Sequence, residues 1–210
     1  MTTPDVQYDS MARQHAAGRL GMWAFLGSEL LLFAGLLALY GAYRFAYPAE
    51  FRIAAQDANV AIGSINTLVL LTSSLTMALA LHAARAPGDP RARLLVLLAI
   101  TFALGVTFDV LKGVEYAGHL ADGTAPGGYS AARVAPPHGI VLYVTLYYVL
   151  TGLHALHVTI GIGVIAWLWS KAWRRQLTPD SHAALELGGL YWHLVDLVWL
   201  FLWPLLYLIR

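Results

Sequence analysis

The sequence predicts an all-α membrane protein, a polytopic bundle of five transmembrane helices. Of its 210 residues, 59% are hydrophobic and 12% are charged, against roughly 25% charged residues in an ordinary soluble domain. The mean hydropathy is +0.62, and the apolar residues fall into five runs that are each long enough to cross the hydrocarbon core. In lipid the backbone polar groups must be satisfied within each segment, so these runs are expected to be helices.

A polar tail, residues 1–19, precedes the first run, and residues 20–210 form one transmembrane domain. The first run is a retained helix rather than a secretory signal, because it is long and ends in an aromatic belt that starts at Tyr40. Prolines and a glycine between Arg85 and Arg91 join the second and third runs as an antiparallel hairpin. The fourth run is so long that it must tilt or project into water. The expected spans are about 20–43, 60–83, 92–116, 138–170 and 184–209.

Lysine and arginine predict the orientation of the bundle. With the N-terminus inside, eight of these residues lie on the cytoplasmic side and five on the outer side. The positive-inside rule therefore favours a cytoplasmic tail and an N-in/C-out arrangement.

Charge and cysteine content exclude several classes of protein. The formal net charge is +1 and the basic residues form no continuous face, so we expect no nucleic-acid partner. The chain has no cysteine, which removes thiolate metal sites, iron–sulfur clusters and disulfides. A metal would therefore have to be held by histidine and carboxylate.

Ionisable side chains inside the apolar runs are the candidate functional residues, because each is costly in hydrocarbon unless it faces protein or water. Glu29 lies near the middle of the first run, either as a structural hydrogen-bonding group or as a group that takes part in proton movement. His154 and His157 share one face of the fourth helix, and His193 and Asp196 repeat that spacing on the fifth. The preferred network pairs Glu29 with His154 or His157, which can share a proton. A polar contact between helices is favoured over a metal site.

Two further patterns accompany these residues. Gly21, Ser28 and Gly35 recur every seven residues beside Glu29, so this small stripe is expected to approach a neighbouring helix closely. On the third helix a polar stripe contains Glu115 and four other side chains. For the stripe as a whole, a solvated or partner-facing helix end is the favoured interpretation. Glu115 itself is also assigned to the polar network between helices, with His154, His157, His193 and Asp196. The stripe's other members are Asp109, Lys112, Tyr116 and His119.

Basic residues mark the expected inner membrane surface. Lys171 and Arg174 follow the fourth run, and Arg19 precedes the first. Such residues set topology and attract anionic lipid headgroups, so both roles stay open here.

Five ordered segments carry a resemblance to a known family. They are Gly21–Glu29 (GMWAFLGSE), Asn66–Ser74 (NTLVLLTSS), Lys112–Tyr116 (KGVEY), Thr151–Val158 (TGLHALHV) and Tyr191–Trp199 (YWHLVDLVW). In content and order they resemble subunit III of the haem–copper respiratory oxidases, in its short five-helix bacterial form.

The resemblance implies a non-catalytic subunit of the bacterial inner membrane that holds no cofactor of its own. Haem and copper are then expected in partner subunits, with subunit I in direct contact and subunit II and others in the same complex. The resemblance also implies bound phospholipid around His157, Lys171 and Arg174. It further implies support of proton uptake and of enzyme stability during aerobic electron transport.

The resemblance leaves some alternatives open. Longer members have two additional N-terminal helices where this sequence has only residues 1–19, and the electron donor can be cytochrome c or quinol. An accessory subunit of nitric oxide reductase shares the expected fold. A dihaem cytochrome b that oxidises quinol would need His157 opposite His193 as haem ligands. A secondary transporter would use Glu29 and Asp196 for ion coupling, but the helices lack the paired glycine or proline interruptions typical of such proteins.

Overall fold

The computed structural model describes residues 10–86, 91–126, 137–177 and 182–208, and within these ranges the regular structure is entirely helical. Two short turns interrupt or extend the helices, the 3-10 turn η1 (Ala55–Asp57) and the π-helical turn η2 (Pro204–Leu208). The helices are α1 (Met11–Ala46), α2 (Pro48–Ala54), α3 (Val60–Arg85), α4 (Arg91–Ala121), α6 (His138–Trp173) and α7 (Ala183–Trp203).

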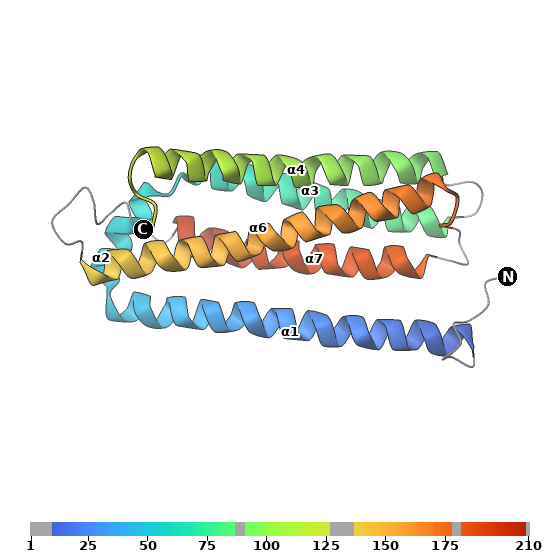
Figure 1. Ribbon diagram of the computed structural model, residues 1–210, viewed down its shortest axis with the longest axis horizontal. Helices are drawn as coiled ribbons and strands as arrows, with labels where there is room; N and C mark the ends of the chain where they lie inside the picture. Colours follow the sequence, from blue (N-terminus) through green and yellow to red (C-terminus); the bar gives the residue numbers. More distant parts are fainter. Residues whose placement is uncertain (1–9, 87–90, 127–136, 178–181, 209–210) are drawn as a thin grey trace.

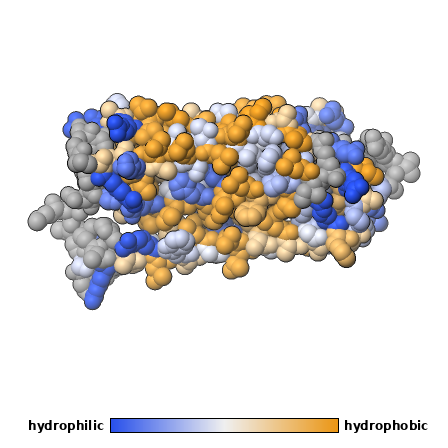
Figure 2. Space-filling view, turned by 180° about the vertical axis from the view of Figure 1, so that it is seen from behind, coloured by the Kyte–Doolittle hydropathy of each residue, from blue (hydrophilic) through white to orange (hydrophobic). Residues whose placement is uncertain are grey.

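Five of these helices are long and apolar enough to cross a membrane, which confirms the predicted five-span fold. They are α1, α3, α4, α6, and α7 together with η2. Because they alternate in direction, the start of α1 and the end of η2 lie at opposite ends of the bundle (Figure 1). Figure 2 shows hydrophobic side chains over the middle of the molecule and hydrophilic ones towards both ends. The N-in/C-out orientation stays a prediction.

The first helix starts earlier than its apolar run. It begins at Met11, within the segment assigned to the polar tail, and the Ser10 hydroxyl caps it by accepting from the Arg13 amide (3.3 Å). Its apolar span starts at Ala16. At the other end of the chain, Ile209 of the predicted fifth span lies outside the described residues.

Four helices form a ring, and the fifth lies on its outside. Helices α3 and α6 each pack against both α4 and α7, whereas α1 packs mainly against α6 and α7 (Figure 1). In the most apolar segment of α1 only 11% of the residues are buried, against 28–50% in the other four. Most of the α1 surface is therefore open to lipid or to another protein.

The stripe of small residues on α1 does not make the close helix contact that we expected. A Cβ added at Gly21 or Gly35 would meet nothing within 4 Å, so that expectation is wrong within the described part of this chain. The helix packs instead through Leu26, Phe33 and Tyr40, which are also seven residues apart and are 6%, 3% and 2% exposed. Large apolar side chains bury more surface against α6 and α7 than small ones, and they decide which face turns inward.

Close approach does occur around a buried tryptophan. Trp192 of α7 is fully buried, and it lies against Gly105 of α4 and Gly161 of α6. A Cβ at Gly161 would stand 2.7 Å from the Trp192 ring, and one at Gly105 would stand 2.9 Å from it. The two glycines thus make room for the indole where three helices meet.

The short helix α2 covers one end of the bundle and was not predicted. Pro48 occupies its first turn, a position where proline is favoured, and that residue was the available sequence signal. Phe51 packs its ring against those of Tyr40 and Tyr143, with centroids 5.5 Å away in both cases. Helix α2 therefore links the outer helix α1 to the start of α6.

Replacing Gly161 with alanine should destabilise the bundle, because the new methyl group forces the buried Trp192 ring to move. We expect a loss of about 1–3 kcal/mol in the free energy of unfolding, measured by thermal or chemical unfolding in detergent. Gly163→Ala, two positions further on α6, is the matched control, since its Cβ would meet nothing within 4 Å. Equal stability of the two variants would contradict this account of the Trp192 contact.

Candidate functional site

A lysine and a glutamate of α4 form an ion pair inside the helix bundle. Lys112 and Glu115 are only 2% and 3% exposed, and the Lys112 Nζ lies 3.0 Å from Glu115 Oε2. Two charges taken out of water cost several kcal/mol each unless every donor and lone pair finds a partner. The surrounding side chains therefore decide whether this pair is tolerated.

Two tyrosine hydroxyls complete the pair. The Lys112 Nζ donates to Tyr147 OH of α6 (3.1 Å) and to Tyr207 OH of η2 (2.8 Å), so all three ammonium donors are used. Each hydroxyl in turn lies 2.9 Å from Glu115 Oε1 and donates to it. Four aromatic rings surround the ammonium with centroids 5.0–5.6 Å away, those of Tyr116, Tyr147, Trp199 and Tyr207. We call Lys112, Glu115, Tyr147 and Tyr207 the ion-pair cage.

The cage corrects one expectation from the sequence. Lys112 and Glu115 do not belong to a solvated or partner-facing helix end, because α4 continues beyond them to Ala121 and neighbouring helices cover them. Tyr116 is also turned inward and its hydroxyl bonds that of Thr151 on α6. Charges near a helix end reach for water only where no partner is available inside the protein.

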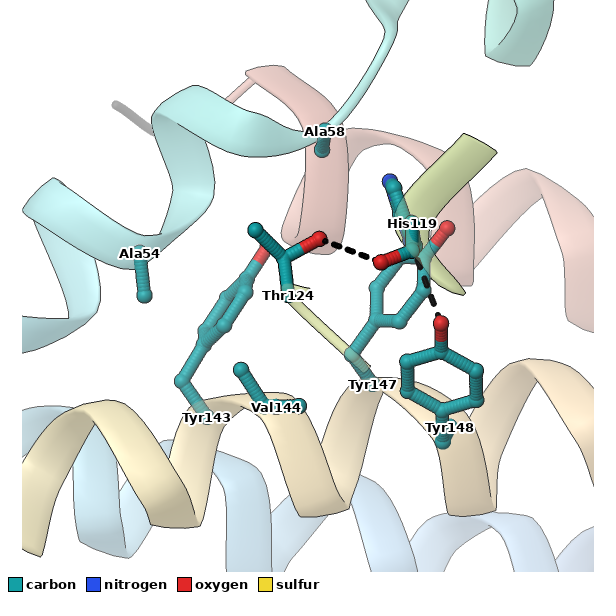
Figure 3. Close-up of a pocket in the computed structure, with 8 residues that line it drawn as sticks. All are labelled: Ala54, Ala58, His119, Thr124, Tyr143, Val144, Tyr147 and Tyr148. Atoms are coloured by element: carbon teal, nitrogen blue, oxygen red, sulfur yellow. Dashed lines mark hydrogen bonds between the residues drawn. The ribbon is translucent and has the colours of Figure 1, made fainter. Parts of the chain in front are cut away.

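A small cavity of about 20 Å³ lies beside the cage, at the end of the bundle that carries α2, with room for a single water molecule. Figure 3 shows the side chains of Tyr143, Tyr147 and Tyr148 from α6 converging on it, opposite Ala54 and His119. The Tyr148 hydroxyl lies 3.4 Å from His119 Nδ1. Tyr147 lines both the cavity and the cage, so one side chain lies between this space and the ion pair.

The structure places Glu29 of α1 against His157 of α6. Glu29 Oε2 lies 2.8 Å from His157 Nε2, and the two side chains are 17% and 11% exposed. His157 Nδ1 is 2.8 Å from the Leu153 carbonyl, which can only accept, so Nδ1 carries a hydrogen. One further proton then lies between Oε2 and Nε2, either on a neutral carboxyl or on an imidazolium that faces a carboxylate. The pair thus shares one hydrogen between α1 and α6.

His154 takes a different environment from its neighbour in the motif. Its side chain is fully buried, and its ring lies between those of Phe33, Phe108 and Trp199, with centroids 5.1–6.5 Å away. Neither ring nitrogen has a hydrogen-bond partner among the described residues. Of the two histidines considered for Glu29, His154 is therefore the one that packs among aromatic rings.

His193 and Asp196 of α7 face α3. The Ser74 hydroxyl lies 2.8 Å from His193 Nδ1, and it also lies close enough to Asp196 to interact with it. Asp196 is 5% exposed, and neither of its carboxyl oxygens makes a hydrogen bond within the described ranges. The polar residues predicted from sequence therefore separate into a Glu29–His157 pair, an α3–α7 contact, an isolated His154 and the cage around Glu115.

The residues expected near lipid lie at different depths. Lys171 and Arg174 end α6, and the Lys171 Nζ lies 4.1 Å above the centre of the Trp167 ring. His157 is fourteen positions earlier on the same helix, about 21 Å along its axis. Arg19 is exposed on α1, whose neighbouring Gly18 faces Leu187 of α7. These four residues therefore do not surround a single lipid headgroup.

Comparison of the sequence with known proteins identifies the family of this chain. The family described as cytochrome c oxidase subunit III matches residues 8–209. The chain belongs to this family. Relatives include cytochrome c oxidase subunit 3 of Synechocystis, 32% identical over 90% of this chain and 74% of the relative. The probable cytochrome c oxidase subunit 3 of Mycobacterium tuberculosis is 30% identical over 95% and 94% of the two chains. Quinol oxidase subunit 3 of Bacillus subtilis is 30% identical over 94% and 91%.

Family membership confirms the resemblance found in the sequence. The chain is a subunit III of the haem–copper oxidase family, so it belongs to an oxidase complex with other subunits. Together with its five helices that can span a membrane, this makes it a multi-pass inner membrane protein. The ion-pair cage was the feature that sequence reasoning missed. Its one local signal was the spacing of Lys112 and Glu115, which places both on one face of a helix.

Removing the lysine of the cage should strongly destabilise this subunit III. Lys112→Met leaves Glu115 buried without its cation, and we expect a loss of about 3–5 kcal/mol in unfolding free energy in detergent. The double variant Lys112→Met, Glu115→Gln should recover much of that loss, because no charge is then left unpaired.

The control for this series is Arg85→Gln at the exposed Arg85–Glu186 ion pair, whose side chains are 53% and 26% exposed. We expect its cost to be about 0–1 kcal/mol. A Lys112→Met variant as stable as this control would show that the buried pair does not hold the bundle together.

Proposed function

We propose that this chain is the non-catalytic, cofactor-free subunit III of a terminal oxidase. In this proposal it packs against the haem–copper subunit I, binds phospholipid, and supports proton uptake and the stability of the enzyme during turnover. The observation that carries the proposal is the family match over residues 8–209. Haem and copper belong to the partner subunits, and the electron donor is cytochrome c or quinol.

The contacts of His157 argue against its use as a haem ligand. Its Nε2 faces Glu29 and its Nδ1 faces the Leu153 carbonyl, whereas an axial ligand needs one free ring nitrogen. This arrangement favours a structural role for these groups over a dihaem cytochrome b.

The Glu29–His157 pair supports the proposed role in proton uptake. The pair lies between α1, the least buried of the five helices, and the ring of four. Its single proton can move between oxygen and nitrogen without leaving either group unbonded. A pair that can hold a proton on either atom fits a subunit that assists proton delivery to its neighbour.

Lipid binding is supported at one end of the bundle. The Lys171 ammonium covers the Trp167 ring, and the Arg91 guanidinium lies 5.4 Å from the centre of the Trp173 ring. Aromatic and cationic side chains together are typical of the headgroup level of a bilayer. We therefore assign phospholipid headgroup contacts to Lys171 and Arg174, and lipid contacts at Arg19 and His157 stay predictions.

Affinity purification of the tagged chain from membranes of its host tests the proposal. We expect a haem–copper subunit to co-purify, identified by mass spectrometry of the bound chains. After separation from the other subunits, the chain itself should have no Soret absorption. A Soret band that stays with the isolated chain and shifts on reduction would overturn the cofactor-free assignment. Repeated recovery without any oxygen-reducing or nitric-oxide-reducing subunit would overturn the accessory role.

Variants of Glu29 test its hydrogen-bonding role in assembly. Glu29→Gln keeps a donor for His157 Nε2 and should leave retention of this chain in the purified oxidase largely intact. Glu29→Ala leaves His157 unpaired, at a cost of about 1–3 kcal/mol, and should reduce retention. Ser28→Ala is the control, because Ser28 is exposed and bonds only the Phe25 carbonyl of its own helix. Equal retention of all four forms would argue against a structural role for the pair.

A further inference from the structure

Asp109 of α4 is an intramembrane carboxyl that the fold does not satisfy. Its Oδ2 accepts from the Thr159 hydroxyl of α6 (2.9 Å), but that hydroxyl is also 2.9 Å from the Ala155 carbonyl. A hydroxyl has one hydrogen, so the two acceptors share it. Asp109 Oδ1 makes no hydrogen bond among the described residues and is itself buried, so Oδ2 is the oxygen that a group from outside the chain can approach. The Asp109 carboxyl therefore shares its one donor hydrogen with a backbone carbonyl, although a carboxylate can accept several hydrogen bonds.

Asp109 and Thr159 lie near the middle of their membrane-spanning helices, at the outer surface of the helix bundle. Asp109 is eighteen positions from Arg91 and twelve from Ala121, about 27 and 18 Å along the helix. Thr159 is exposed and Asp109 is half-buried. A charged or polar group that faces hydrocarbon at this depth costs several kcal/mol, and such groups almost always face protein in the assembled membrane protein.

The other intramembrane carboxyls differ in this respect. Glu29 is paired with His157, and Glu115 with Lys112. Asp196 also has unbonded oxygens, but it is 5% exposed, so a group from outside the chain cannot reach it. Asp109 differs because it is half-buried and its one donor, the shared hydroxyl of Thr159, is exposed, so this pair presents polar atoms at the surface of the bundle.

An apolar groove continues from Asp109 along the line where α4 and α6 meet. It is lined by Ala99 and Phe102 of α4 and by Ala166 and Trp169 of α6, with a volume of about 260 Å³. Phe102 and Ala166 are each seven positions from Asp109 and Thr159, two turns along the same helix faces. On the other side of Asp109, a Cβ added at Gly113 would meet nothing within 4 Å. We call this line, from Gly113 through Asp109 and Thr159 to the groove, the α4–α6 seam.

We propose that the α4–α6 seam is the docking surface for a transmembrane helix of a partner oxidase subunit. That helix donates a hydrogen bond to Asp109 from a hydroxyl, amide, indole or cationic side chain, and it places a large apolar side chain in the groove two turns away. A helix is favoured over a lipid because an acyl chain has no donor for the carboxyl. Small residues at Gly113 and Ala155 let the partner backbone approach.

The inference rests on the proposed function, because it needs a membrane-spanning partner beside this chain. It goes further by assigning the surface and the chemistry of the contact. Interhelical hydrogen bonds and close packing of small residues are the interactions that hold helices together in lipid. The seam offers both, together with a groove for shape complementarity.

Asp109→Leu tests the proposal in the intact complex purified through a tag on the haem–copper subunit. Loss of one interhelical hydrogen bond of about 1.4 kcal/mol should lower retention of this chain about tenfold. Asp109→Asn keeps an acceptor for the partner and should retain this chain as the unaltered protein does. Val110→Leu, at the next position and 58% exposed, is the matched control and should have no effect. Thermal unfolding of the isolated chain in detergent should be unchanged in all three variants, which separates docking from folding.

Photo-crosslinking identifies the occupant directly. Val106 is 37% exposed and lies one turn from Asp109 on the same side of α4. Benzoylphenylalanine at this position should form an adduct with a membrane-spanning polypeptide of the complex. Phospholipid adducts alone, or full retention of the Asp109→Leu variant, would overturn the docking assignment. The proposed function would still stand in that case, because the chain co-purifies with the haem–copper subunit. If the unaltered chain is never recovered with the tagged subunit, both ideas fail.

Discussion

The structure depends on one constraint: a charged group at membrane depth must find its partners inside the protein. Lys112 and Glu115 meet it by neutralising each other and by sharing the hydroxyls of Tyr147 and Tyr207. This joins α4, α6 and η2 at one point and fixes their relative positions. A shift of one of these helices by a single turn, about 5.4 Å, would leave a charge unpaired in a low-dielectric interior. Helices α4 and α6 and the turn η2 therefore have a defined register that apolar packing alone specifies weakly.

The same constraint positions α1, which has little buried surface of its own. Glu29 ties it to His157, and the Tyr40 hydroxyl donates to the Leu205 carbonyl at the end of the bundle (2.7 Å). Carbonyls in the last turn of a helix have no partner within that helix, so Tyr40 fills a need that the fold itself creates. Helix α1 is thus held by a few directional contacts rather than by a broad apolar face.

Hydropathy was sufficient to predict the fold, because a run that must cross the hydrocarbon core has a fixed minimum length. It was insufficient to predict which face of each helix turns inward. On α1 a small stripe and a large apolar stripe both repeat every seven residues, and only packing distinguishes Gly21 from Leu26. The chemistry of a carboxyl and an imidazole pointed to a partner for Glu29 among two histidines. The burial of Lys112 was missed because its partner Tyr207 lies 95 positions away in the sequence, where no local pattern connects the two.

That separation has a consequence for biogenesis. Helix α4 leaves the ribosome and enters the lipid phase long before Tyr207 is synthesised, so the insertion machinery must accommodate Lys112 and Glu115 while half of their ligands are still missing. During that interval the two side chains can neutralise only each other. The cage is therefore complete only once the final helix has packed against α4 and α6, which makes it one of the last polar clusters of the bundle to form.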